Sequence, residues 1–221
     1  MTHPPRIAML GGTFDPVHNG HLRSAVELRD ALGLDRVHMI PAPQPPLRDT
    51  PQVSPQQRLE LLQTAIGDTP GLEADARELE RDGPSYSVDT LRSLRNEYGE
   101  QARLVMAIGW DAFLRLDQWH KPEQLFAFAH LVVIARPGHA EAPSTPLMEL
   151  LGEREVDSVF RLMASPHGQV LRVTLPSAMA ISATHIRQSL EQGKSIRFLV
   201  PEAVERAILR EGLYQRWQSA H

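Results

Sequence analysis

The sequence predicts an α/β fold: a doubly wound parallel sheet of about five to six strands with a small helical portion near the carboxyl end. Short segments rich in apolar residues alternate along the chain with longer segments in which apolar residues recur at helical spacing. This alternation is typical of βα units, which build parallel sheets. The 221 residues suit one such domain, so we expect a single domain over 1–221, with the helical portion at about 182–221.

The segment 104–108 is continuously apolar, as expected for a strand at the centre of the sheet. The expected strands are residues 7–10, 37–40, 72–76, 104–108, 131–135 and 170–175. Helices are expected at about 22–32, 55–66, 85–98 (opened by Ser85-Tyr86-Ser87), 122–129, 145–152, 156–163, 183–192 and 201–210. Ser54 and Ser182 stand where N-caps are favoured, Pro201 stands at a first helical position, and Gly99 follows an expected helix end.

The composition excludes several classes of protein. A net charge of −4 gives no basic surface for nucleic acid or an anionic membrane, so we expect neither as a partner. The chain has no cysteine, which excludes disulfides, thiolate metal sites and a thiol nucleophile, and which fits a reducing compartment. The apolar stretch 125–135 is too short to span a membrane, and the run before Gly11 is too short for a signal peptide. We therefore expect a cytoplasmic protein.

The most informative segment, between the first expected strand and the first expected helix, reads Gly-Gly-Thr-Phe-Asp-Pro-Val-His-Asn-Gly-His-Leu over residues 11–22. Gly11 and Gly12 allow a ligand to approach the backbone closely, because they have no Cβ. His18 and His21 are three residues apart and lie on one side of the incoming helical turn. The N–H groups and the positive dipole end of that helix favour an anion at the same place. Together these features predict a phosphate site.

Two other interpretations of this segment remain open. It could be an ordinary turn with two solvated histidines, or the histidines could ligate a metal, although no third ligand is evident nearby and we expect no resident metal. Known nucleotide and hydrolase motifs are missing: the chain has no Gly-x-Gly-x-x-Gly at its first turn and no Gly-x-Ser-x-Gly. Gly193-Lys194-Ser195 resembles the end of a P-loop, but it follows an expected helix and has Gln188 where a P-loop needs glycine.

A second segment, Ile-Ser-Ala-Thr-His-Ile-Arg at 181–187, resembles the first in its chemistry. Ser182 and Thr184 supply hydroxyl groups at a helix start, and Arg187 projects from the first turns of the same helix. Hydroxyls, helix N–H groups and a guanidinium form a second phosphate cradle. The alternative is an ordinary N-capped helix with one surface arginine.

The two motifs, in this order, resemble the signature of the nucleotidyltransferase superfamily, which moves AMP or CMP onto a phosphorylated acceptor. In that superfamily a segment like 181–187 closes over the triphosphate opposite His-x-Gly-His. Five further segments resemble the bacterial nicotinate-mononucleotide adenylyltransferase family in content and order: Pro-Pro-Leu-Arg at 45–48, Pro-Ser-Tyr-Ser at 84–87, Ile-Gly-Trp-Asp at 108–111, Trp119, and Arg-Pro-Gly at 136–138. The resemblance runs from Gly11 to about Tyr214 and implies a Rossmann-like fold.

The resemblance implies an enzyme of NAD biosynthesis that transfers AMP from ATP to nicotinate mononucleotide and gives deamido-NAD and pyrophosphate, with Mg²⁺ entering bound to ATP. It implies catalytic roles for His18, His21, Arg48 and Arg187. The implied ATP-binding residues are Gly11, Gly12, Thr13, Phe14, His18, His21, Gly109, Asp111, Ile181, Ser182 and Arg187. The implied nicotinate mononucleotide-binding residues are Thr13, Arg48, Tyr86, Ser87, Trp119 and Arg136.

Two features of this chain bear on the acceptor. Ser87 begins an expected helix, so N–H groups near it favour the nicotinate carboxylate over an amide. The family commonly has His where this chain has Leu47, and leucine cannot contact phosphate through a hydrogen bond, which shifts that role to Arg48. Other interpretations are an adenylyltransferase for nicotinamide mononucleotide or another phosphorylated acceptor such as phosphopantetheine, and a non-catalytic nucleotide-binding module. The sequence does not indicate an oligomeric state.

Overall fold

A computed structural model describes residues 3–43, 51–135, 141–177 and 179–215. Its described residues form one parallel sheet with the strand order β3-β2-β1-β4-β5-β7-β6. The strands are β1 (Arg6–Gly12), β2 (Arg36–Pro41), β3 (Leu72–Ala74), β4 (Arg103–Gly109), β5 (His130–Ala135), β6 (Glu155–Val156) and β7 (Val170–Thr174). The predicted doubly wound, Rossmann-like α/β fold is confirmed, and β4 is the central strand, as its continuous apolar run predicts.

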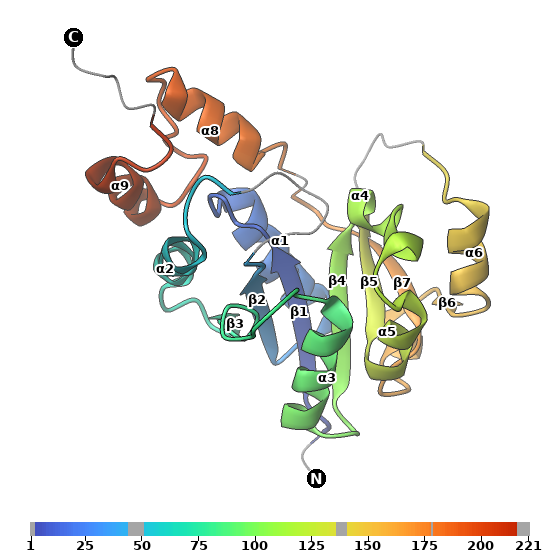
Figure 1. Ribbon diagram of the computed structural model, residues 1–221. Coiled ribbons are helices and arrows are strands. Elements are labelled where there is room, and N and C mark those ends of the chain that lie inside the picture. The colour runs from blue at the N-terminus through green and yellow to red at the C-terminus, as the bar shows by residue number, and fades with distance from the viewer. Residues whose placement is uncertain (1–2, 44–50, 136–140, 178, 216–221) are drawn as a thin grey trace.

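The site-bearing edge of the sheet follows from this strand order. β1 pairs with β2 on one side and with β4 on the other, so the direction in which the chain winds reverses between β1 and β4. Leu10 is in register with Ala107, so that Gly12 and Gly109 end neighbouring strands. In Figure 1 the arrowheads of β1 and β4 point to the same edge. Parallel sheets bind ligands at such a point, outside the carboxyl ends of the strands.

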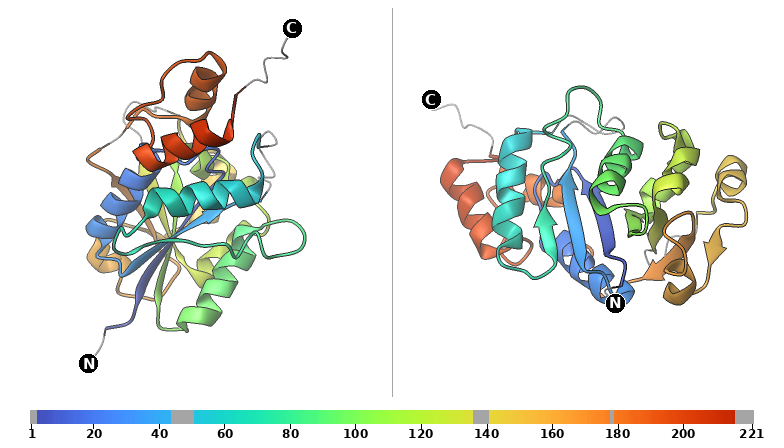
Figure 2. Two further views of the ribbon diagram at one scale, coloured as in Figure 1. Left: turned by 90° about the vertical axis from the view of Figure 1, so that its left-hand side faces the viewer. Right: turned by 90° about the horizontal axis from the view of Figure 1, so that it is seen from below.

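Helices cover both faces of the sheet, with α1 on one face and α3 and α5 on the other (Figures 1 and 2). The helices are α1 (Asn19–Leu32), α2 (Pro55–Ile66), α3 (Ser87–Tyr98), α4 (Trp110–Phe113), α5 (Pro122–Phe128), α6 (Thr145–Leu151), α7 (Val159–Leu162), α8 (Ala183–Glu191) and α9 (Glu202–Glu211), with a 3₁₀ turn η1 at Leu116–Gln118. Strand residues alternate between the two resulting cores: in β1, Ala8 packs with α1, and Ile7 and Met9 pack with α3.

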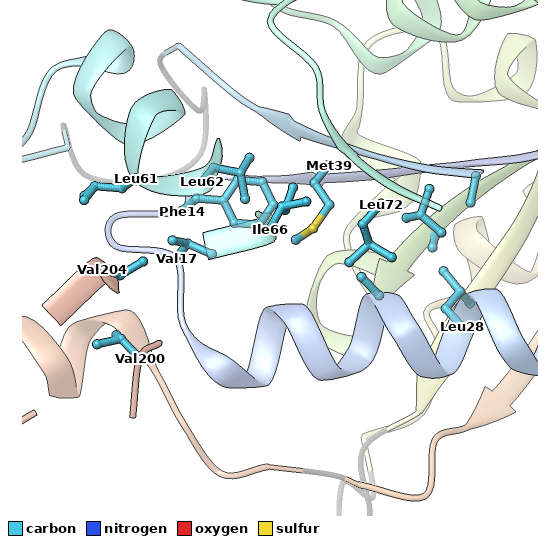
Figure 3. Close-up of a cluster of buried hydrophobic side chains, with 14 of the residues drawn as sticks. Phe14, Val17, Leu28, Met39, Leu61, Leu62, Ile66, Leu72, Val200 and Val204 are labelled. Carbon is cyan, nitrogen blue, oxygen red and sulfur yellow. The ribbon is translucent and has the colours of Figure 1, made fainter. Parts of the chain in front are cut away.

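The carboxyl-terminal helices pack onto the same core as the first motif. α9 lies against α2, and the two helices are side by side in both views of Figure 2. Figure 3 shows Val200 and Val204 on the side of the buried cluster where Phe14 and Val17 lie. The segment after β7 is therefore attached to the loop that follows β1 by a continuous apolar core.

Several predicted bounds were wrong. The sheet has a seventh strand, β6, whose second residue, Val156, lies where the sequence predicts the start of a helix over 156–163; only Val159–Leu162 is helical there. β3 ends at Ala74 rather than at residue 76. Pro201 is the N-cap of α9 and not its first helical residue. Within the described residues, no helix has both the length and the apolar character needed to cross a membrane.

Candidate active site

The loop that follows β1 is folded into the protein rather than extended into solvent. Phe14 has a φ of 50° and is 2% exposed, because its ring enters the core beside Leu62 and Ile66 (Figure 3). A Cβ on Gly12 would lie 2.9 Å from that ring, so only glycine fits there. The peptide bond between Asp15 and Pro16 is cis. The loop thereby delivers His18 to the start of α1.

His18 and His21 cap α1 reciprocally. Nδ1 of His18 accepts a hydrogen bond from the backbone N–H of His21, and Nδ1 of His21 accepts one from the N–H of His18, both at 3.3 Å. The rings are stacked, with centroids 3.6 Å apart and planes inclined by 19°. Because each Nδ1 accepts, the proton of each neutral ring is on Nε2. In the neutral form, each of these two nearly parallel imidazoles has its donor at Nε2, beside a helix start that has no acidic residue in its first turn.

Gly20 allows three parts of the site to approach one another. A Cβ added there would lie 3.0 Å from Nδ1 and 3.1 Å from Cε1 of His18. The same Cβ would lie 3.7 Å from Cβ of Ile181, the first residue of the second motif. The two motifs therefore meet at Gly20, although they lie far apart in the sequence.

The second motif is fixed to the first by Arg187. Ser182 is the N-cap of α8 and accepts a hydrogen bond from the N–H of His185, as its position predicts. The Nη1 group of Arg187 donates to the backbone carbonyl of Asp15 at 2.6 Å, and Nη2 donates to Thr184 Oγ1 at 3.4 Å. α8, like α1, has no acidic residue in its first turn. Two helix starts, two imidazoles and a guanidinium are thus gathered around one loop.

Arg58 on α2 is a component of this region that the sequence does not reveal. Its side chain is fully buried and donates to four backbone carbonyls in two loops: that of Thr13 after β1, and those of Ala42, Pro43 and Val53 between β2 and α2. Burial lowers the pKa of its guanidinium, and the nearby Asp15 carboxylate opposes this effect. Arg58 holds the loop after β1 against the loop after β2. No periodic pattern marks it, because its partners are loop carbonyls.

Aromatic residues and a further helix start lie along the same edge, after β3 and β4. Tyr86 is the N-cap of α3 without a side-chain hydrogen bond to its first turn, and Ser87 is the first helical residue. The Tyr86 ring stacks on His120 with ring centroids 4.0 Å apart. Trp119, the residue before His120, is half-buried and, like Tyr86, packs against the apolar core that contains Val88 and Leu91. Gly109, the exposed N-cap of α4, and the exposed Asp111 follow β4 directly.

Beneath the start of α3, the buried carboxyl of Glu78 accepts a hydrogen bond from Thr90 Oγ1 at 2.7 Å. Burial raises the pKa of Glu78. Thr90 Oγ1 also lies 3.4 Å from the backbone carbonyl of Tyr86. Glu78 and Thr90 therefore hold the first turn of α3, and neither is suggested by a sequence motif.

Comparisons with known proteins show the family to which this chain belongs. A model of the cytidylyltransferase-like family matches residues 9–189. A relative from Chromohalobacter salexigens is 63% identical over 211 residues, which cover 96% of each chain, and one from Pseudomonas putida is 47% identical over 210 residues, which cover 95% of each. Both are named probable nicotinate-nucleotide adenylyltransferase. This chain belongs to the nicotinate-nucleotide adenylyltransferase family.

A solved structure has the same fold as this chain. The Plasmodium falciparum nicotinic acid mononucleotide adenylyltransferase complexed with NaAD matches with a TM-score of 0.71 and 14% sequence identity. The match covers 95% of this chain and 97% of the other. At that identity the likeness shows the fold alone. The shared fold includes nearly all of both chains.

Within this family fold, the predicted residues divide into three groups. Those of the two motifs lie together: Gly11, Gly12, Thr13, Phe14, His18, His21, Ile181, Ser182 and Arg187. A second group follows the neighbouring strands: Tyr86, Ser87 and Trp119 of the predicted acceptor set, and Gly109 and Asp111 of the predicted ATP set. Arg48, Leu47 and Arg136 lie outside the described residues. No group of three or more His, Asp or Glu side chains placed to hold a metal ion occurs among the residues that the structure describes.

Proposed function

We propose that this protein transfers AMP from ATP to nicotinate mononucleotide and releases pyrophosphate, giving deamido-NAD. One observation carries the proposal: Arg187 donates to the carbonyl of Asp15, which places the second helix start against the loop that leads to His18 and His21. A triphosphate needs donors on more than one side, and this arrangement supplies them from α1 and α8. The 63% identity to a relative of that name supports the choice of substrates.

The reaction is a direct in-line displacement. A phosphate oxygen of nicotinate mononucleotide forms a bond to the α-phosphorus of ATP while the bond from that phosphorus to the bridging oxygen breaks, and pyrophosphate leaves with the electron pair. The second pKa of a phosphate monoester is near 6, so the acceptor is mostly ionised at neutral pH and needs no general base. Catalysis then consists of positioning and of stabilising the charge that develops on the phosphates.

We assign the phosphates of ATP to the two motifs. The backbone bonds to both Nδ1 atoms orient the rings so that His18 and His21 donate from Nε2. We assign His21 to the position nearer the transferred group. Arg187 and Ser182 hold the β and γ phosphates, and Arg48 approaches them from the loop after β2. Gly11, Gly12, Thr13, Phe14 and Ile181 provide close backbone contact, and Gly109 and Asp111 serve the nucleoside.

We assign nicotinate mononucleotide to the edge between α3 and η1. Trp119 stacks on the pyridine ring, and the N–H groups near Tyr86 and Ser87 receive the nicotinate carboxylate; Thr13, Arg48 and Arg136 complete the set. The start of α3 has no side-chain cap, which leaves its first-turn donors suited to an anion. An amide would turn an NH₂ group toward these donors, at a cost of about 1–3 kcal/mol.

Three further features belong to the proposal. Mg²⁺ enters as part of the substrate, held by phosphate oxygens and water. The chain is a single domain over 1–221 whose helical portion at about 182–221 shares the core with Phe14 and Val17. The protein acts in the cytoplasm, without nucleic acid or membrane as a partner, as its composition predicts.

A pyrophosphate-release assay tests the proposal, with MgATP and, side by side, nicotinate mononucleotide, nicotinamide mononucleotide and phosphopantetheine. We expect turnover with the first and a kcat/KM at least about tenfold lower with the second. His21→Ala should lower kcat by about a hundredfold, whereas His3→Ala, an exposed histidine before β1, should not change it. A higher kcat/KM with another acceptor would replace nicotinate mononucleotide as the assigned substrate. ATP binding without turnover would favour a non-catalytic nucleotide-binding module.

A further inference from the structure

The loop that follows β1 contains a buried carboxylate, that of Asp15, which the proposed reaction does not use. Asp15 is 4% exposed. Its Oδ1 accepts a hydrogen bond from the hydroxyl of Tyr214 at 2.8 Å, and its Oδ2 accepts one from the backbone N–H of Gln52 at 3.2 Å. Tyr214 is 6% exposed and lies 199 residues after Asp15. A carboxylate is seldom buried unless a cation or hydrogen-bond donors compensate its charge.

The charge partner of Asp15 is Arg187, but the pair is held slightly apart. Nη1 of Arg187 lies 3.8 Å from Oδ2 of Asp15, beyond hydrogen-bond distance, and bonds instead to the backbone carbonyl of Asp15 at 2.6 Å. The short contacts of the carboxylate go to Tyr214 and Gln52. Within the described residues, the hydrogen bonds of Arg187 use two of its five N–H groups.

This geometry has a consequence for the guanidinium. A carboxylate that lost the Tyr214 hydroxyl would keep its charge and would satisfy Oδ1 by turning to the nearest cation. Arg58 already gives four of its five N–H groups to carbonyls, whereas Arg187 uses two within the described part of the chain, so Arg187 is the cation with donors available to Asp15. Burial and the adjacent Asp15 carboxylate raise the pKa of Tyr214, so its hydroxyl remains a donor throughout the physiological range.

We propose that Asp15 and Tyr214 are positioning residues: they fix the guanidinium of Arg187 from behind so that its remaining donors face the phosphates of ATP. The carboxylate supplies the charge that keeps Arg187 at the loop, and the tyrosine keeps the carboxylate from engaging it fully. The proposal rests on the proposed function only in naming the ATP phosphates as what Arg187 binds. It makes the segment after α9 a part of the site.

The test uses Tyr214→Phe with a matched control. Tyr98→Phe also removes a tyrosine hydroxyl that makes a 2.8 Å hydrogen bond, to Nε2 of His38, on the α3 side of the sheet. We expect both variants to lose similar, small amounts of thermal stability. Only Tyr214→Phe should raise the KM for ATP, by about tenfold, while the KM for the acceptor changes by less than about twofold.

A double-mutant cycle separates positioning from a merely structural role. In an Arg187→Ala background, Tyr214→Phe should change the KM for ATP by less than about twofold, because the group it positions is gone. The same cycle is measured by calorimetry as the Kd for MgATP, with Asp15→Asn as a second variant. An unchanged ATP affinity in Tyr214→Phe, or an equal loss in both backgrounds, overturns the proposal. If the unmodified protein binds MgATP but does not turn over, the proposed function fails, and the calorimetric cycle still decides the role of Tyr214.

Discussion

Gly20 offers a substitution that should separate activity from stability. It is the second residue of α1, in a backbone conformation that alanine adopts readily, since its φ is not in the left-handed region. Gly20→Ala would place a methyl group 3.0 Å from Nδ1 and 3.1 Å from Cε1 of His18. Because contacts that short require the neighbour to move by a few tenths of an ångström, the ring of His18 must shift.

The two effects of this methyl group oppose one another in stability but not in activity. Alanine in place of glycine in a helix contributes about 0.5–1 kcal/mol, and an imidazole displaced from its preferred geometry costs about 0.5–1.5 kcal/mol. The free energy of unfolding should therefore change by less than about 1 kcal/mol, or a few degrees in Tm. A displacement of about 1 Å in an active site can cost a hundredfold in rate, so the smaller shift of His18 should lower kcat/KM by about three- to tenfold.

Pyrophosphate release and thermal unfolding should be measured on the same preparations of the unmodified protein, Gly20→Ala, His18→Ala and the double variant. Without the imidazole, the methyl group has only the ordinary 3.7 Å contact with Ile181, so Gly20→Ala should have no further effect in that background. If His18→Ala turns over too slowly, the Kd for MgATP replaces kcat/KM. Unchanged kinetics in Gly20→Ala, or the same loss with and without His18, would refute this account of the glycine.

Three further predictions concern the core and the acceptor side. Arg58→Met leaves four carbonyls without their donor and should lower the free energy of unfolding by about 3–5 kcal/mol, measured by urea denaturation. Trp119→Ala should raise the KM for nicotinate mononucleotide by about tenfold, with a smaller change in the KM for ATP in steady-state assays. His130 is fully buried, and burial lowers its pKa from 6.5 to about 4. Between these two pH values the unfolded chain binds a proton at this residue that the folded chain does not. The contribution of His130 to the free energy of unfolding is therefore fully present above about pH 6.5, and it falls by about 1.4 kcal/mol per unit of pH toward 4.

Each of these has a control. Arg206→Met removes an exposed arginine and should change the free energy of unfolding by less than about 0.5 kcal/mol. A similar loss in both arginine variants would refute the claim that the carbonyl bonds of Arg58 stabilise the fold. Equal changes in the KM of both substrates would mean that Trp119 supports the fold rather than the acceptor. His130→Asn should flatten the pH dependence of unfolding above pH 4, and an unaltered slope would place the titration elsewhere.

The sequence predicts the elements that a local pattern defines. Apolar runs locate most strands, and Ser54 and Ser182 begin α2 and α8 as N-caps because a hydroxyl at a helix start has a local partner three residues on. β6 escapes prediction because its two residues, Glu155 and Val156, have neither an apolar run nor alternation. α4 and η1 escape because each is about one helical turn long, too short for a periodic signal.

The site shows the same division. His18, His21 and Arg187 are predicted because they stand in short motifs beside expected helix starts. That the two histidines cap the helix themselves is not predicted, since serine, threonine, aspartate and asparagine are the usual N-caps. Arg58 and Tyr214 could not be found, because their partners are loop groups up to 199 residues away and their burial depends on tertiary packing.

The bond between Tyr214 and Asp15 also bears on the order in which the molecule is completed during synthesis. Domains of a growing polypeptide begin to fold from the amino end, so β1, α1 and the paired histidines can form early. The Asp15 carboxylate in the loop after β1 can accept the Tyr214 hydrogen bond only after α9 has been synthesised. A chain that stops before residue 214 should therefore form most of the sheet yet bind ATP weakly, so that full activity should appear only after Tyr214 has been added.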